Sequence, residues 1–256
     1  MSPVDPAFAY AQPRLQARYG ARPSAAQLSH VAATADLGAA LQVLRATPFA
    51  RWTDRMGPRP RVHEVDLRLR GAWLDGVDEI ASWQPEAWRA AALWTRWIAY
   101  LPALQKLARG GRARNWMRDD PVLGPIVARE PRERAAALKR TPLAPLAAGF
   151  ATPPDIAAAW IAHWKKLWPR GRAGHAPIEA MLRAIAAQRA KLAALPANAR
   201  SLDALRELER HFELAFRRNP LSPATAIAYL GLLALDLRRI RGALVTRALR
   251  ESTTPP

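Results

Sequence analysis

Residues 228–242, AYLGLLALDLRRIRG, are the most informative stretch for the fold. Their first half is apolar on nearly every side, and their second half is abruptly basic. Such a segment is compatible with a membrane anchor, a nucleic-acid-binding arm or a core helix. The surrounding apolar run, 224–235, contains Thr225 and Gly231 and ends at Asp236. A helix that spans a bilayer needs about 20 apolar residues, so this run is too short to cross one.

The same stretch predicts one long helix that closes the core. The helix is expected to begin at Ser222, with Pro223 in its first turn, and to end near Arg250. Where the apolar half becomes basic, Asp236 is expected to pair with Arg239, its i+3 neighbour. One apolar stripe follows spacings of three and four residues and comprises Ile227, Leu230, Leu233, Leu237, Ile240 and Leu244.

The helical pattern extends through most of the chain. Residues 62–83 alternate apolar and polar side chains as a strand does, but no second candidate strand exists to pair with them, so a helix is expected. Pro102 is expected to break the segment 84–109, and the proline-rich residues 117–154 predict short helices and turns. Further helices are predicted at residues 24–33, 36–46, 155–168, 177–195 and 201–217.

These patterns together predict an all-α protein that consists of multi-helix bundles, with about ten helices in total. The whole chain, 1–256, is expected to form a single helical domain. Within it, the breaks in the pattern suggest sub-bundles at 1–60, 61–150 and 151–256.

The composition limits the chemistry that the chain can perform. It contains no cysteine, which excludes disulfides, thiolate metal sites and thiol nucleophiles. The net charge of +18 favours anionic partners, namely nucleic acid, acidic lipid surfaces or acidic proteins. The cations are mostly arginine and are scattered along the sequence. The first residues lack the pattern of a signal peptide, so a cytoplasmic location is expected.

Motifs that mark catalytic or cofactor sites are missing from the sequence. No pair of its five histidines has the HxxxH spacing of a metal site, and neither a GxSxG, a Walker A nor a GxGxxG motif occurs. We therefore expect no catalytic residue, no bound cofactor and no metal site in this chain. Glu209 and Glu213 are four residues apart, but Arg206 and Arg210 alternate with them, which is typical of a solvated helix face.

Ten tryptophans give the chain a second unusual feature. Trp160, Trp164 and Trp168 follow each other at i, i+4 and i+8, and Trp94 and Trp97 share a helical face. Such stripes stack on nucleic-acid bases in some proteins, but at helical spacing they more often belong to a core or to a protein interface. A basic, tryptophan-rich nucleic-acid-binding protein remains the alternative function.

Both ends of the chain resemble one protein family. The sequence begins with a tyrosine-containing helix that bears spaced arginines, and a leucine-rich helix then ends in a Leu-to-Thr-Pro turn. It closes with Tyr-Leu, an acidic residue and an arginine-rich apolar helix. These features resemble the C (V-ATPase d) subunit family of rotary V/A-type ATPases. The residues that carry the resemblance are Tyr10, Arg14 and Arg18, then Leu44, Thr47, Pro48 and Phe49, and finally Tyr229, Leu230, Asp236, Arg238, Arg239, Ile240 and Arg241.

The resemblance implies a set of related helical subdomains in a funnel-like arrangement. It implies a non-catalytic central-stalk subunit that couples the rotor stalk to the proteolipid (c/K) ring during proton or sodium transport. Such a subunit is peripheral on the cytoplasmic face of the membrane, and its partners are the proteolipid ring and the central rotor stalk subunits. The candidate partner interface comprises Arg14, Arg18, Arg238, Arg239 and Arg241.

Overall fold

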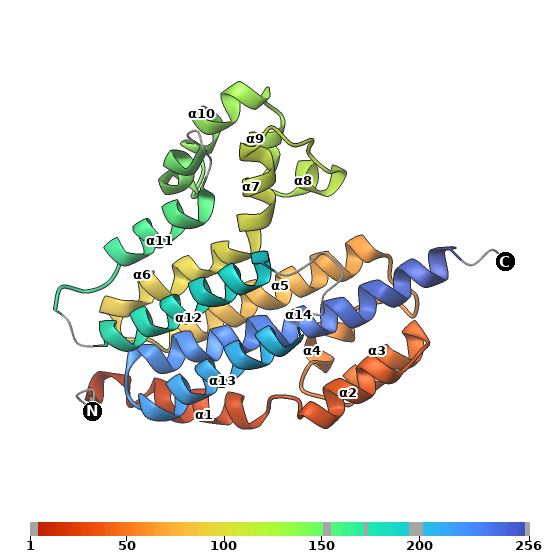
Figure 1. Ribbon diagram of the computed structural model, residues 1–256, viewed down its shortest axis with the longest axis horizontal. Coiled ribbons are helices and arrows are strands. Elements are labelled where there is room, and N and C mark those ends of the chain that lie inside the picture. The colour runs from red at the N-terminus through yellow and green to blue at the C-terminus, as the bar shows by residue number, and fades with distance from the viewer. Residues whose placement is uncertain (1–4, 151–154, 172–173, 195–201, 254–256) are drawn as a thin grey trace. The chain divides into compact units, whose positions relative to one another are not determined.

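The computed structural model describes residues 5–150, 155–171, 174–194 and 202–253 (Figure 1). These residues form fourteen α-helices and four 3-10 helices without any strand, and the helical content is 77%. Ten of the α-helices have eight residues or more, while the other four have only four or five. The all-α, multi-helix fold class is therefore confirmed, while the number of helices exceeds the expected ten because short helices add to the ten longer ones.

The chain divides into two compact units. Unit 1 comprises residues 1–92 and 170–256, and unit 2 comprises residues 93–169. Helix α6 (Glu86–Trp94) runs across the first division. These divisions differ from the sub-bundles that the sequence suggested at 1–60, 61–150 and 151–256, since residues from both chain ends join in one unit.

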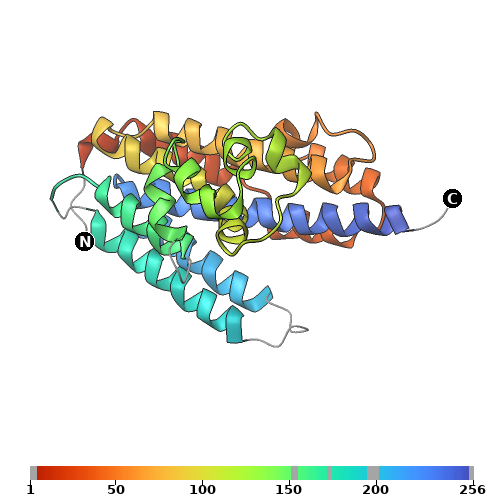
Figure 2. The same cartoon turned by 90° about the horizontal axis from the view of Figure 1, so that it is seen from above.

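Unit 1 is organised around its longest helix, α14 (Pro223–Thr253). Both views show α5 (Val62–Ser82) beside α14 (Figure 1 and Figure 2). Helices from both ends of the chain also contact α14, so residues far apart in the sequence share one core. These helices are α1 (Ala11–Gly20), α2 (Ala25–Ala33), α3 (Leu37–Arg45), α12 (His175–Ala194) and α13 (Leu202–Arg218), and the short α4 (Ala50–Thr53) packs on α3 and α5.

Local sequence signals explain where several of these helices begin. Ser24 and Gln27 form a reciprocal capping box at the start of α2. The Asp36 carboxylate accepts a hydrogen bond from the Ala39 N–H and caps α3. Residues 62–82 are helical in α5, as expected for a segment without a strand to pair with.

The predicted apolar stripe of α14 is buried along most of its length. Leu230, Leu233, Leu237, Ile240 and Leu244 are each at most 6% exposed, whereas Ile227 is only half-buried. Burial of this stripe against α5 and α13 removes several large aliphatic side chains from water, at roughly 1.5–3 kcal/mol each.

Two glycines allow the helices of unit 1 to approach closely. A Cβ atom at Gly231 of α14 would lie 2.6 Å from Cζ of Phe212 on α13. A Cβ atom at Gly76 of α5 would lie 2.7 Å from Cδ2 of Leu233. Both distances are far below normal van der Waals contact, so glycine at these positions sets how closely α13 and α5 pack on α14.

Unit 2 consists of short helices and turns, as its prolines predict. Pro102 stands in the first turn of α7 (Leu101–Ala108), and the preceding segment is the 3-10 helix η2 (Thr95–Tyr100). Then come α8 (Asn115–Asp119), α9 (Gly124–Val127), η3 (Pro131–Glu133), α10 (Arg134–Leu138), η4 (Ala144–Phe150) and α11 (Ile156–Lys166). Their core contains Leu104, Leu107, Leu123, Ile126, Leu138, Leu143, Leu146 and Ile156, each at most 1% exposed.

Side-chain bonds to the backbone hold these short elements together. The buried Arg134 donates from Nη1 to the carbonyl oxygens of Leu107, at 3.3 Å, and Gly111, at 3.1 Å. Asp155 caps α11, and Gln105 of α7 accepts a hydrogen bond from the Ile156 N–H. Among the described helices, none is long and apolar enough to cross a membrane.

Candidate partner interface

A buried carboxylate lies in the middle of α14. Asp236 is 1% exposed, and it follows the apolar half of the helix. The Arg22 guanidinium binds this carboxylate through two hydrogen bonds, Nε to Oδ2 at 2.8 Å and Nη2 to Oδ1 at 3.0 Å. An ionised carboxylate removed from water requires such a partner. Arg22 belongs to the connection between α1 and α2, so this ion pair joins the two ends of the chain.

Three further charged residues extend this pair into a network, which we call the buried ionic cluster. Glu209 of α13 accepts hydrogen bonds from Arg22, Nη2 to Oε1 at 3.0 Å, and from Arg239, Nη1 to Oε1 at 2.8 Å. Glu213 lies 3.6 Å from Arg22, and Arg239 lies 3.8 Å from Asp236. The buried ionic cluster therefore comprises Arg22, Glu209, Glu213, Asp236 and Arg239, and it fastens α13 and the α1–α2 connection to α14.

The charges of the buried ionic cluster alter each other's proton affinity. Burial acts against the charged form of Arg22, but the hydrogen bonds and charges of Asp236 and Glu209 outweigh it and raise the Arg22 pKa. The hydrogen bond from Arg239 lowers the pKa of Glu209. Burial raises the pKa of Asp236, although the bonds from Arg22 oppose that shift. Nearby on α14, burial raises the pKa of Tyr229 to about 12.

The structure uses three of the five arginines of the expected interface for contacts within the protein. Arg18 is bound to Glu79 of α5, and Arg239 belongs to the buried ionic cluster. Arg241 binds Asp66 of α5 through Nε and Oδ1 at 2.7 Å. These three side chains fasten helices of unit 1 to each other.

The other two arginines of the expected interface remain exposed. Arg14 donates to the Tyr10 carbonyl oxygen at 3.0 Å, and its guanidinium carbon lies 3.7 Å from the centre of the Tyr10 ring. Arg238 is exposed, and no side chain among the described residues binds it. Both are therefore available to a partner, from α1 and from α14 respectively.

The sequence pattern identified part of the buried ionic cluster and missed the rest. Asp236 and Arg239 lie within ion-pair distance as expected, but Arg22 is the closer partner of Asp236. Glu209 was expected on a solvated face, yet only 19% of its side chain is exposed, because it faces α14. One sequence feature indicated that Asp236 has a second cationic partner. Asp236 stands at the end of an apolar run, and a carboxylate buried there needs a partner.

The tryptophan stripe lies in the interior of unit 2. Trp160, Trp164 and Trp168 are each at most 9% exposed. Their rings contact one another, with centroid separations of 5.1 Å and 5.2 Å between successive residues. Trp94 is also buried and packs on His163 at 4.3 Å. These rings belong to a core, so they offer no surface on which bases could stack.

Two hollows are lined by charged side chains, one in unit 2 and one on α13 at Arg206, Glu209, Arg210 and Glu213. A hollow of about 440 Å³ in unit 2 is lined by prolines and by Arg129, Glu133, Arg140 and Thr141. Among the described residues, no three histidine, aspartate or glutamate side chains lie where they could hold a metal ion. No family model, curated protein or solved structure matches the chain.

Proposed function

We propose that the protein is a non-catalytic central-stalk subunit of a V/A-type ATPase, which couples the rotor stalk to the proteolipid ring during proton or sodium transport. In this role it is peripheral on the cytoplasmic face of the membrane. The proposal starts from the resemblance of both chain ends to the C (V-ATPase d) subunit family.

One structural observation carries the proposal further. The residues of the resemblance come from the first fifty and the last thirty residues of the chain, and the structure gathers them in unit 1 around α14. Arg22 and Asp236 join these ends although 214 positions separate them in sequence. If both chain ends build one folded unit, this explains why the residues that resemble the family occur at both ends of the sequence.

A coupling subunit transmits torque through packing, so it requires a body that resists deformation. The features of α14 suit that requirement. It is 31 residues long, it contacts helices from both chain ends, and the buried ionic cluster and the Arg241–Asp66 pair fasten it to α13, α5 and the α1–α2 connection. Arg14 and Arg238 are the candidate contacts to the ring or the stalk, because both remain exposed.

The test is affinity purification of the tagged full-length protein from detergent-solubilised membranes of its native host. Mass spectrometry is expected to identify the proteolipid and the central-stalk subunits. The variant R14E/R238E is expected to lose most of this association while its melting temperature stays unchanged. The matched control is R55E/R59E, which reverses two exposed arginines between α4 and α5 and is expected to retain the partners.

Recovery of the protein without any ATPase subunit would overturn the proposal. Equal loss of the partners in R14E/R238E and R55E/R59E would show that total charge, rather than these two arginines, determines the association.

Nucleic-acid binding is the alternative, and the net charge of +18 favours it. Because the Trp160–Trp164–Trp168 stripe is buried, it cannot stack on bases, and this alternative depends mainly on phosphate contacts. It requires an affinity for DNA or RNA that falls steeply as salt is added. A flat salt response would exclude it.

A further inference from the structure

Residues 106–140 of unit 2 concentrate the positive charge of the protein. They include ten lysines and arginines against four aspartates and glutamates, which gives a net charge of +6 in 35 residues. The total for the 256 residues is +18. About a seventh of the chain therefore carries a third of the net charge. In the sequence these cations are interspersed with glycines and prolines and form no continuous basic run.

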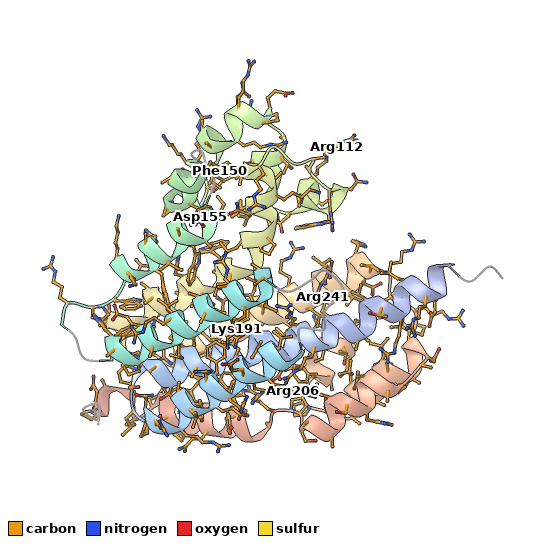
Figure 3. The ribbon with its side chains drawn as sticks, viewed as in Figure 1. Arg112, Phe150, Asp155, Lys191, Arg206 and Arg241 are labelled. Atoms are coloured by element: carbon orange, nitrogen blue, oxygen red, sulfur yellow. The ribbon has the colours of Figure 1, made fainter. Side chains whose placement is uncertain are left out.

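The fold of unit 2 brings these residues together. Arg134 ties the start of α10 to the end of α7 and to the loop after it, and α9 contacts both α8 and α10. Within this unit, α8, α9 and α10 gather near the C-terminal end of α7 (Figure 1). Arg112, which is labelled in Figure 3, lies in the loop that follows α7.

Eight cations in this stretch are exposed and free of contacts, and we call them the basic end of unit 2. Among the described residues none of the eight takes part in an ion pair, a side-chain hydrogen bond or a ring contact. In unit 1 several arginines are paired with carboxylates, while Arg55, Arg59, Arg61 and Arg68 are exposed without such a partner among the described residues. The basic end of unit 2 comprises Arg109, Arg112, Arg114, Arg118, Arg129, Arg132, Lys139 and Arg140.

We propose that the basic end of unit 2 is a docking surface for anionic phospholipid headgroups. The eight exposed cations outnumber the four carboxylates of the same stretch and leave a local positive potential, and each cation near an anionic bilayer strengthens binding by about fivefold. No large apolar side chain in this stretch is exposed. The contact is therefore electrostatic, without insertion into the hydrocarbon region.

Features of the surface favour lipid over nucleic acid. Of the eight cations, only Arg118 lies within an α-helix, the five-residue α8, and Arg132 lies in the 3-10 helix η3, so the surface presents no recognition helix for a DNA groove. Four tryptophans of the unit, Trp94, Trp160, Trp164 and Trp168, are buried and offer no platform for bases, and Trp116 of α8 is half-buried.

A lipid surface also suits the cations better than a rigid acidic protein does. None of the eight side chains is held by a hydrogen bond, so none is preorganised toward a fixed carboxylate. A fluid array of headgroups requires no fixed spacing. The choice of lipid among anionic surfaces also rests on the proposed function, which brings the protein to the membrane face.

The experiment is co-sedimentation of the full-length protein with vesicles of phosphatidylcholine that contain about 30 mol% phosphatidylglycerol. The protein is expected to bind these vesicles and not to bind vesicles of phosphatidylcholine alone. Its binding is expected to fall steeply as salt rises to about 300 mM.

The variant R112Q/R114Q/R118Q/R132Q is expected to lower the partition coefficient at least about 100-fold. The matched control R55Q/R59Q/R61Q/R68Q removes four exposed, contact-free cations from unit 1 and is expected to stay within about threefold of wild type.

Three results would overturn the inference. The first is failure of the wild-type protein to bind the anionic vesicles, and the second is equal loss of binding in the two quadruple variants. The third is displacement from the vesicles by a short DNA duplex at equal phosphate concentration and about 150 mM salt, which would favour nucleic acid. The vesicles contain no protein, so a negative result leaves co-purification with ATPase subunits unaffected, and failure of that co-purification leaves vesicle binding measurable.

Discussion

At the scale of single residues, Asp236 is a carboxylate held in the interior of unit 1 by one arginine. Its carboxylate is 1% exposed and receives two hydrogen bonds from Arg22. Whether such a pair strengthens the fold relative to an apolar pair depends on the cost of burying both charges. Removal of only one partner is a simpler case, because it leaves an uncompensated charge in the interior.

The variant Arg22→Gln is therefore expected to lower the free energy of unfolding by about 3–5 kcal/mol. Chemical denaturation followed by circular dichroism measures this loss. The control Arg18→Gln breaks a pair whose side chains are 38% and 26% exposed, and about 1 kcal/mol or less should be lost. A loss below about 1 kcal/mol in Arg22→Gln would contradict the assignment. Addition of Asp236→Asn to Arg22→Gln should restore part of the stability.

Glu209 gives the buried ionic cluster a dependence on pH. Its pKa is lowered in the folded protein by the hydrogen bond from Arg239, so the carboxylate prefers the ionised form when folded. The associated stability is complete above the pKa of the unfolded chain, about 4.3. It is lost as the pH falls through the lower pKa of the folded state. The raised pKa of Asp236 acts in the opposite direction.

We expect the variant Glu209→Gln to lose less of its melting temperature than wild type between about pH 5 and pH 3. Asp236 is retained in this variant, and the Glu209 charge is the smallest of the causes that shift its pKa, so the comparison reports mainly on Glu209. Glu86→Gln removes an exposed carboxylate at the start of α6 and should keep the wild-type slope. Parallel curves for wild type and Glu209→Gln would show that this carboxylate has no part in the acid response.

At the scale of elements, the contact of α13 with α14 depends on the absence of a side chain at Gly231. A glycine inside a helix costs about 1 kcal/mol relative to alanine, so its presence in α14 needs a reason. The nearby Phe212 ring explains why glycine stands here, because a Cβ atom at Gly231 would lie between 2.6 and 2.8 Å from three ring atoms. Phe212 is only 5% exposed and has little room to move.

Two glycines of α14 are accordingly expected to respond in opposite directions to alanine. Gly231→Ala should destabilise the protein, because overpacking costs about 1–3 kcal/mol and outweighs the gain in helix propensity. Gly242→Ala should stabilise it by up to about 1 kcal/mol, since a Cβ atom there meets nothing within 4 Å. Urea denaturation of both variants measures these changes. Stabilisation by Gly231→Ala would mean that the two helices lie further apart.

At the scale of the whole molecule, the chain builds one unit from its two ends and another from its middle. Residues 93–169 form unit 2 alone, while residues 1–92 and 170–256 combine in unit 1. Sequence pattern could not reveal this, because hydrophobic periodicity reports which face of a helix is buried but not which helix covers it. The same limitation explains why the suggested sub-bundles are continuous segments.

The two proposals use different parts of the molecule. The proposed ATPase contact uses Arg14 and Arg238 of unit 1, while the lipid contact uses the basic end of unit 2. Each has its own set of variants with a matched charge control. The outcome for one unit is therefore measured separately from the outcome for the other.

The sequence by itself determined that the protein is all-α and which helix closes the core. These properties follow from spacings of three and four residues, from capping residues and from prolines, which act within a few positions of the chain. The tertiary structure alone decided that Arg22 neutralises Asp236 across 214 positions. It alone decided that Arg18, Arg239 and Arg241 fasten helices and that eight cations of unit 2 stay unpaired. The physical reason is that an ion pair depends on distance in space, and only the packed fold sets which distant charges come within a few ångströms.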